Sequence, residues 1–290
     1  MGKVKKYILY IMKHLQTISC LLALTIMTLP FNRIMAQDNS HKDTLSVDVM
    51  SLRVSYEVKY HHDIEEGESL EDDYCRTEKI ITEAGPSLAH SYSVFEKEVD
   101  EQMEKRQADK GHRSVDFRAL HAQFGEYYVN YPKGEQTAIF NMHEPGLYKY
   151  SEPLPKMKWK IGKETKEVLG YMCTKATMSH RGRTWTAWFT NDIPVTRGPL
   201  FFGGLPGLIL ELQDSETHFT FTCDGIEKAD DNTPILFVNK DFSESTRDVV
   251  RKTEVSLLKH PTEFFVPYGI TLRMDGQPFS PMPYNPIELK

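Results

Sequence analysis

Most of the chain after residue 44 alternates between apolar and polar side chains. Every second residue from Leu52 to Val58 is apolar, and the residues between them are charged or polar. A period of two is typical of a β-strand with one face in water. The same character returns along much of the chain, so we expect strands or short strand meanders at 45–60, 76–84, 87–95, 127–150, 157–190, 208–212 and 219–223.

Two segments change to the longer period of a helix. Phe95, Val99 and Met103 lie four residues apart among charged residues, which predicts a short surface helix over 95–110. The segment 243–260 predicts a second helix, with Ser243 or Ser245 as its N-cap. Six prolines follow residue 260, so an irregular tail is expected. The predicted fold class is mainly β. We expect a curved antiparallel sheet, similar in form to a half-barrel, with one or two helices packed on it.

A glycine-rich stretch, RGPLFFGGLPGLILELQD (197–214), precedes one of these strands. The order Pro206-Gly207 suits a type II turn with positive φ at Gly207, followed by a strand from Leu208. A phosphate-binding loop is excluded, because it would lead into a helix and carry a Lys-Ser/Thr pair. Gly203 and Gly204 leave room either for a close backbone crossing or for a ligand. Both alternatives stay open.

Aromatic residues gather around this stretch. They could line an apolar pocket for a lipid chain or an extended polypeptide, or they could be core residues between the sheet and the helices. The candidate residues for binding a ligand or partner are Trp185, Trp188, Phe201, Phe202, Gly203, Gly204, Leu205, Pro206 and Gly207.

The first 36 residues have the features of a secretory signal peptide. Four lysines precede an apolar run, and cleavage is expected after Ala36. A membrane anchor is the alternative, but the run is shorter than the roughly 20 residues that span a bilayer. Residues 37–290 show no internal repeat or linker, which predicts a single β-rich domain with a proline-rich tail. The expected location is the periplasm, the cell envelope or the medium, with no membrane span after cleavage.

The charge of the mature chain limits the kinds of partner. Without the leader, 30 Lys and Arg face 41 Asp and Glu, a net charge of −11. An acidic chain is a poor candidate for binding nucleic acid, because such binding depends on neutralising phosphates. It is equally unsuited to a polybasic contact with a membrane surface.

Three cysteines remain after cleavage, namely Cys75, Cys173 and Cys223. An oxidising compartment allows one disulfide, and we expect Cys173 and Cys223 to lie on neighbouring strands and to form it. Three buried free thiols are the alternative. No two cysteines have C-x-x-C spacing, so neither a zinc site nor another cofactor is expected.

Motifs for catalysis are missing from the sequence. It contains neither a G-x-S-x-G elbow nor an H-E-x-x-H zinc helix. A hydrolase with an unrecognised site stays open, because the members of a triad meet in space rather than in sequence. His61-His62-Asp63 could serve a metal-binding accessory factor, although a solvated acidic loop explains these residues as well.

The run GLPGLI (204–209) resembles the signature of the GLPGLI family, exported proteins typical of Bacteroidota. The preceding residues, KEVLGYMCTKA and RGRTWTAWFTNDIPVTRGPLFFGG, are similar to the family's approach to that motif. The resemblance is specific over 161–226 and weaker over 52–99 and near the carboxyl-terminal helix. The resemblance implies an envelope or secreted location. It implies no particular reaction, because no biochemical activity is established for the family. We therefore expect a non-enzymatic carrier or accessory protein that binds an apolar or peptide-like ligand or an envelope partner protein.

Overall fold

The computed structural model describes residues 43–61, 75–110, 124–143, 145–274, 277–282 and 284–289. The predicted leader and most of the histidine-containing acidic loop after His61 lie outside these residues. Within the described part of the chain, no helix is long and apolar enough to cross a membrane.

Strands are the main regular elements of the described chain. They are β1 (Asp43–Val49), β2 (Leu52–His61), β3 (Cys75–Ala84), β4 (Ala89–Ser93), β5 (Glu126–Val129), β6 (Glu135–Asn141), β7 (Leu147–Pro153), β8 (Lys160–Val168), β9 (Tyr171–His180), β10 (Arg183–Thr190), β11 (Leu208–Asp214), β12 (Phe219–Lys228), β13 (Pro234–Asn239), β14 (Phe242–Glu244), β15 (Arg273–Met274) and β16 (Gln277–Pro278). Twelve of them form one sheet in the order β14-β7-β6-β5-β4-β3-β2-β12-β11-β10-β9-β8. Neighbours are antiparallel except β14 and β7, so the predicted mainly β class is confirmed.

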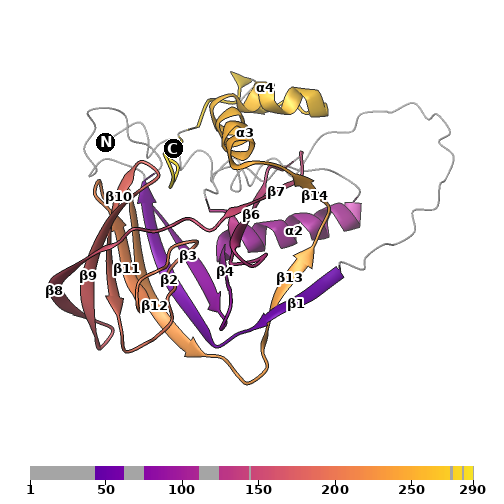
Figure 1. Cartoon of the computed structure of the whole chain (residues 1–290). Coiled ribbons are helices and arrows are strands. Elements are labelled where there is room, and N and C mark those ends of the chain that lie inside the picture. Colours follow the sequence, from indigo (N-terminus) through magenta and orange to yellow (C-terminus); the bar gives the residue numbers. More distant parts are fainter. Residues whose placement is uncertain are drawn as a thin grey trace, which may run out of the picture. The chain divides into compact units, whose positions relative to one another are not determined.

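The large sheet is strongly curved, and Figure 1 shows the bend through β12, β2 and β3. Six strand spacings separate β5 from β10, which in a flat sheet is roughly 29 Å. A chain of ring contacts nevertheless joins them: Tyr127 meets Phe201 at 5.1 Å, Phe201 stacks on Phe202 at 4.5 Å, and Phe202 meets Trp185 at 4.7 Å between centroids. The segment after Gly198 therefore fills the concave face, which holds the main hydrophobic core.

Smaller elements cover other parts of the sheet. Strands β1 and β13 form a separate two-stranded ribbon, and helix α2 (Val94–Lys110) packs against β3 and β4 (Figure 1). Helix α3 (Arg247–Lys259) confirms the second predicted helix, although its N-cap is Thr246 and not Ser243 or Ser245. The tail is more regular than expected, because Pro261 at the first helical position begins α4 (Pro261–Phe265), which continues into the 3-10 helix η2 (Val266–Tyr268).

The glycine-rich turn differs from the prediction. Gly204, and not Gly207, has the positive φ, at 83°. Gly207 is needed for a different reason: a Cβ atom there would lie 1.9 Å from the carbonyl oxygen of Thr190. At Gly203 a Cβ atom would lie 2.7 Å from the carbonyl oxygen of Thr196. The glycines therefore permit close backbone crossings, which is one of the two alternatives that the sequence left open.

We expect Gly207→Ala to destabilise the fold by about 1 to 3 kcal/mol or more, because the added methyl group must displace main chain. Chemical denaturation measures the change. Gly162→Ala is the matched control, since its Cβ atom would come no closer than 3.3 Å to another residue and its φ is not positive. Equal stability of the two variants would contradict the explanation by close approach.

The expected pairing of two cysteines is not seen. Cys173 lies in β9 and Cys223 in β12, and β10 and β11 run between these strands, so they are not on neighbouring strands. All three described cysteines are free thiols, two of them buried and Cys75 exposed. Burial raises the pKa of both Cys173 and Cys223 to about 11, so the two thiols stay protonated near neutral pH.

Candidate functional site

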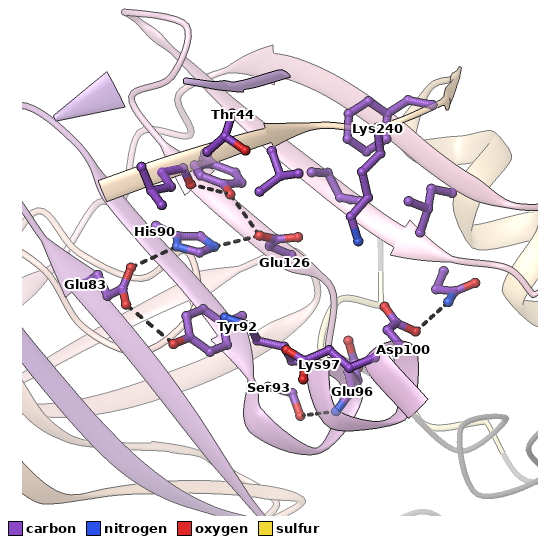
Figure 2. Close-up of a pocket in the computed structure, with 18 of the residues that line it drawn as sticks. Thr44, Glu83, His90, Tyr92, Ser93, Glu96, Lys97, Asp100, Glu126 and Lys240 are labelled. Carbon is purple, nitrogen blue, oxygen red and sulfur yellow. Dashed lines mark hydrogen bonds and ion pairs between the residues drawn. The ribbon is translucent and has the colours of Figure 1, made fainter. Parts of the chain in front are cut away.

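A pocket of about 520 Å³ lies on the face of the sheet opposite the main core. Strands β3 to β6 form its floor, the first turns of α2 form one wall, and the β1–β13 ribbon forms another (Figure 2). Its lining combines acidic, aromatic and aliphatic side chains: Thr44, Glu83, His90, Tyr92, Ser93, Glu96, Lys97, Asp100, Glu101, Glu126, Tyr128, Ile139, Asn141, Leu147, Pro234, Leu236, Val238, Lys240 and Phe242.

The floor of the pocket is a row of cross-strand neighbours. Arg53 of β2 is paired with Glu83 of β3, Glu83 with His90 of β4, and His90 with Tyr128 of β5. Directly opposite residues on adjacent strands point to the same face, so antiparallel pairing alone gathers these side chains. The neighbouring Ser91 points the other way, into the core, where its hydroxyl accepts from the amide of Leu200.

His90 bridges two carboxylates. Its Nδ1 lies 3.1 Å from Glu83 Oε2 and its Nε2 lies 2.7 Å from Glu126 Oε1 (Figure 2). The ring stacks on Tyr128 with centroids 4.3 Å apart, and the Tyr128 hydroxyl donates to the same oxygen of Glu126 at 2.9 Å. His90 is only 7% exposed, so this bridge is formed almost entirely out of water.

The bridge changes the protonation of all three groups. Burial alone would lower the pKa of His90, but the hydrogen bonds and charges of Glu126 and Glu83 outweigh it and raise that pKa. Burial alone would raise the pKa of both glutamates, but the hydrogen bonds and charge of His90, with smaller contributions from Arg53 and Lys97 at Glu83 and from Tyr128 and Lys240 at Glu126, lower both pKa values. Glu83 and Glu126 are therefore ionised near neutral pH.

A carboxyl group of the opposite kind stands at the start of α2. Ser93 and Glu96 have the S-x-x-E spacing of a capping box, and the Glu96 amide donates to Ser93 Oγ at 3.2 Å. The Glu96 carboxyl instead accepts from the amide of Phe124 at 2.9 Å. Burial, together with the negative charges of Glu78 and Asp100, raises the pKa of Glu96 well above its usual range. The pKa values of Glu96 and Glu126 are therefore shifted in opposite directions.

The rest of the lining completes two contrasting walls. The ribbon and its continuation supply Leu236, Val238 and Phe242, whereas α2 supplies Asp100 and Lys97. Lys97 Nζ lies 4.6 Å from the centre of the Tyr92 ring, and the charge of Lys240 helps to lower the pKa of Glu126. Chemically, the pocket combines two carboxyl groups, whose pKa values are shifted in opposite directions, with an apolar surface.

The residues predicted from the sequence lie elsewhere. Trp185, Phe201, Phe202 and Leu205 are at most 2% exposed and belong to the core, and Gly203 and Gly207 are buried with them. Gly204 and Pro206 are exposed, and Trp188 is half-buried with Lys166 Nζ 4.6 Å from its ring centre. The structure thus brings the predicted residues together as packing, and their role in binding a ligand or partner stays a prediction.

The residues that line the pocket are not among those predicted from the sequence. The signal was present, because Gly85-Pro86 separates two predicted strands and their antiparallel pairing would set Glu83 opposite His90. The S-x-x-E spacing at Ser93 was a second signal, of a helix start that carries a carboxyl group. The metal site considered from the sequence consisted of His61, His62 and Asp63. His61 is the last residue of β2, and His62 and Asp63 lie outside the described residues. No group of three His, Cys, Asp or Glu in the described ranges is placed to hold a metal ion.

Comparison with known families gives one match. The model of the N-glycanase peptide, N-terminal domain, matches residues 112–251, just under half of the chain. Solved structures of PNGF-II in the C2 and P21 space groups are both 18% identical over 71% and 70% of this chain, with TM-scores of 0.47 and 0.46. This chain spans about a third of theirs, namely 32% and 33%. None of the curated proteins matches it.

The family match corrects three expectations. It replaces the resemblance to the GLPGLI family, for which the comparisons give no support. It also contradicts the interpretation as a non-enzymatic carrier and the leaning toward a protein without enzymatic activity, because the matched model describes a domain of an N-glycanase. The GLPGLI run led to them because a short turn motif determines local packing and carries no information on chemistry.

Proposed function

We propose that this chain is a hydrolase of the N-glycanase kind, acting on N-linked glycans of glycoproteins, and that the pocket holding His90 is its active site. This takes up the hydrolase alternative that the sequence left open. One observation carries the proposal: Glu96 and Glu126 line the same pocket, and their surroundings shift their pKa values in opposite directions. Two carboxyl groups whose pKa values are pushed apart by their surroundings are suited to act as acid and base. The family match supports the choice of substrate.

The two walls of the pocket suit a sugar ring. A pyranose has an apolar face of C–H groups, which can lie against Phe242 and Leu236, and an edge of hydroxyl donors, which can reach Glu126 and Asp100. A volume of about 520 Å³ lies within the usual range for a small-molecule site.

The proposed reaction adds one water molecule across a carbon–nitrogen bond of the linkage that joins the glycan to the protein. Glu96 gives its proton to the departing nitrogen, and the water molecule attacks the carbon from which the nitrogen leaves. Glu126 orients this water and takes the proton that it loses, so proton return from Glu126 to Glu96 restores both groups. The surrounding apolar wall limits access of bulk water, which strengthens the electrostatic contribution of both carboxyls. The predicted leader supports placing this activity outside the cytoplasm.

The full chain is expected to release glycan from an N-glycosylated glycopeptide. Mass spectrometry of both the released glycan and the remaining peptide measures the reaction. A glycopeptide whose sugar is attached through serine or threonine is the matched control and should stay intact. Binding of the N-glycosylated peptide without release, or no interaction at all, would contradict the proposed hydrolase.

A further inference from the structure

His90 lies between two carboxylates, Glu83 and Glu126, although the proposed acid–base pair of Glu96 and Glu126 does not itself require a histidine. Both carboxylates line the pocket: Glu126 approaches His90 from β5, and Glu83 approaches it from β3 on the other side. Glu83 is held in turn by Arg53, whose Nη2 donates to Glu83 Oε1 at 3.3 Å and to the Tyr92 hydroxyl at 3.1 Å. Charges thus alternate in sign across β2, β3, β4 and β5.

We propose that His90 is a positioning residue that fixes Glu126 as a carboxylate for hydrolysis, and that Glu83 is the group that keeps His90 charged. This inference rests on the proposed function. Neither His90 nor Glu83 needs to touch the substrate, since both act through Glu126.

The geometry supports this assignment. Both partners of His90 are carboxylates that accept hydrogen bonds, so both ring nitrogens must carry a proton for both contacts to be made. A neutral imidazole has one N–H and would leave one buried carboxylate facing a lone pair. The doubly protonated ring is therefore the form that satisfies the bridge, and its charge opposes protonation of Glu126.

The other groups around His90 are compatible with this charge. Glu83 reaches it from β3, Tyr92 from its own strand, and Glu126 and Tyr128 from β5. The cations around it are Arg53 of β2, Lys97 of α2 and Lys240 after β13, and the acidic groups of α2 that line the pocket are Glu96, Asp100 and Glu101. The two carboxylates contact the ring nitrogens directly, at 3.1 and 2.7 Å, and these contacts favour the positive form of His90.

A purely structural ion pair would hold the strands together without affecting the protonation of the pocket. The first measurement separates the two possibilities in the unmodified protein. Nitrogen-15 NMR of the histidine rings in the full chain should show both His90 nitrogens protonated near neutral pH. A neutral His90 under these conditions would overturn the proposal. This result does not depend on hydrolysis, so it stays informative if the proposed function itself fails.

The second measurement uses Glu83→Gln. Glu57→Gln is the matched control, because Glu57 lies on the neighbouring strand β2 and on the same face of the sheet as Glu83. Loss of the Glu83 charge should leave His90 neutral near neutral pH, so the pKa of Glu126 rises. The acid limb of the pH profile of glycan release should move upward by about one pH unit, with kcat reduced below that limb and KM little changed. Glu57→Gln should leave the profile in place. A Glu83→Gln protein that unfolds more easily but keeps its acid limb and a charged His90 would show a structural role only and overturn the proposal.

Discussion

Glu96→Gln is expected to reduce the rate of glycan release by about 10²- to 10⁴-fold, the usual contribution of a general acid. Glutamine has nearly the same shape and can still accept from the amide of Phe124, so the start of α2 should be kept. It carries no proton that it can give to the departing nitrogen. Because Glu96 must be protonated to act, the parent's activity should fall as pH rises through its raised pKa, and the variant should lack this alkaline limb.

Glu98→Gln is the matched control for this prediction. Glu98 lies on the same helix two residues away, is exposed and does not line the pocket. Its substitution should leave the rate and the pH profile unchanged. Assays of glycan release across pH, together with circular dichroism to check the helix, measure both variants. Equal rates for Glu96→Gln and the parent would remove Glu96 from the acid role.

Most of the fold could be predicted because alternation of side chains determines which segments become strands. The strand β2 and the β9–β10 hairpin at Arg181-Gly182 lie where the pattern placed them. The helix ends were less accurate, since Ser243, Ser245 and Thr246 all suit an N-cap. Ser243 lies in β14, and Ser245 donates its amide to the carbonyl oxygen of Lys149 at 2.8 Å, so the helix begins after Thr246, whose hydroxyl accepts from the amide of Val249. The curvature of the sheet was expected as a class, but not that the segment after Gly198 fills its concave face.

The candidate site could not be predicted in the same way, because its members are separated in sequence. Glu83, His90 and Glu126 come together only once the order and register of β3, β4 and β5 are known. The pKa values of these groups depend further on burial. Alternation shows which residues share a face of the sheet, but not that α2 and the β1–β13 ribbon cover the face that carries these side chains. The aromatic residues near Gly203 looked more distinctive in the sequence, yet base rates favoured a core role, and the structure buries most of them.

Removal of the buried Arg183 side chain is expected to cause the largest loss of stability. Arg183 Nη1 donates to Asp214 Oδ2 at 2.9 Å, and the two side chains are 3% and 1% exposed. Its Nη2 also donates to Asn285 Oδ1 at 2.5 Å and to the carbonyl oxygen of Pro286 at 2.7 Å, which ties the carboxyl-terminal segment to the β10–β11 pair. Arg183→Met should lower the free energy of unfolding by about 3 to 5 kcal/mol, because Asp214 is left as an uncompensated buried charge.

A second substitution tests this cause. Asp214→Asn keeps an oxygen that can accept from the amide of Phe219, as Asp214 Oδ1 does at 2.9 Å, but removes the charge. The double variant Arg183→Met with Asp214→Asn should therefore recover part of the stability that Arg183→Met loses. Lys163→Met on the exposed side of β8 is the control and should stay within about 0.5 kcal/mol of the parent. Chemical denaturation gives the free energies, and limited proteolysis reports on the segment that contains Asn285 and Pro286. If Arg183→Met were as stable as the control, or if the double variant were less stable than Arg183→Met, the uncompensated charge of Asp214 would not be the cause.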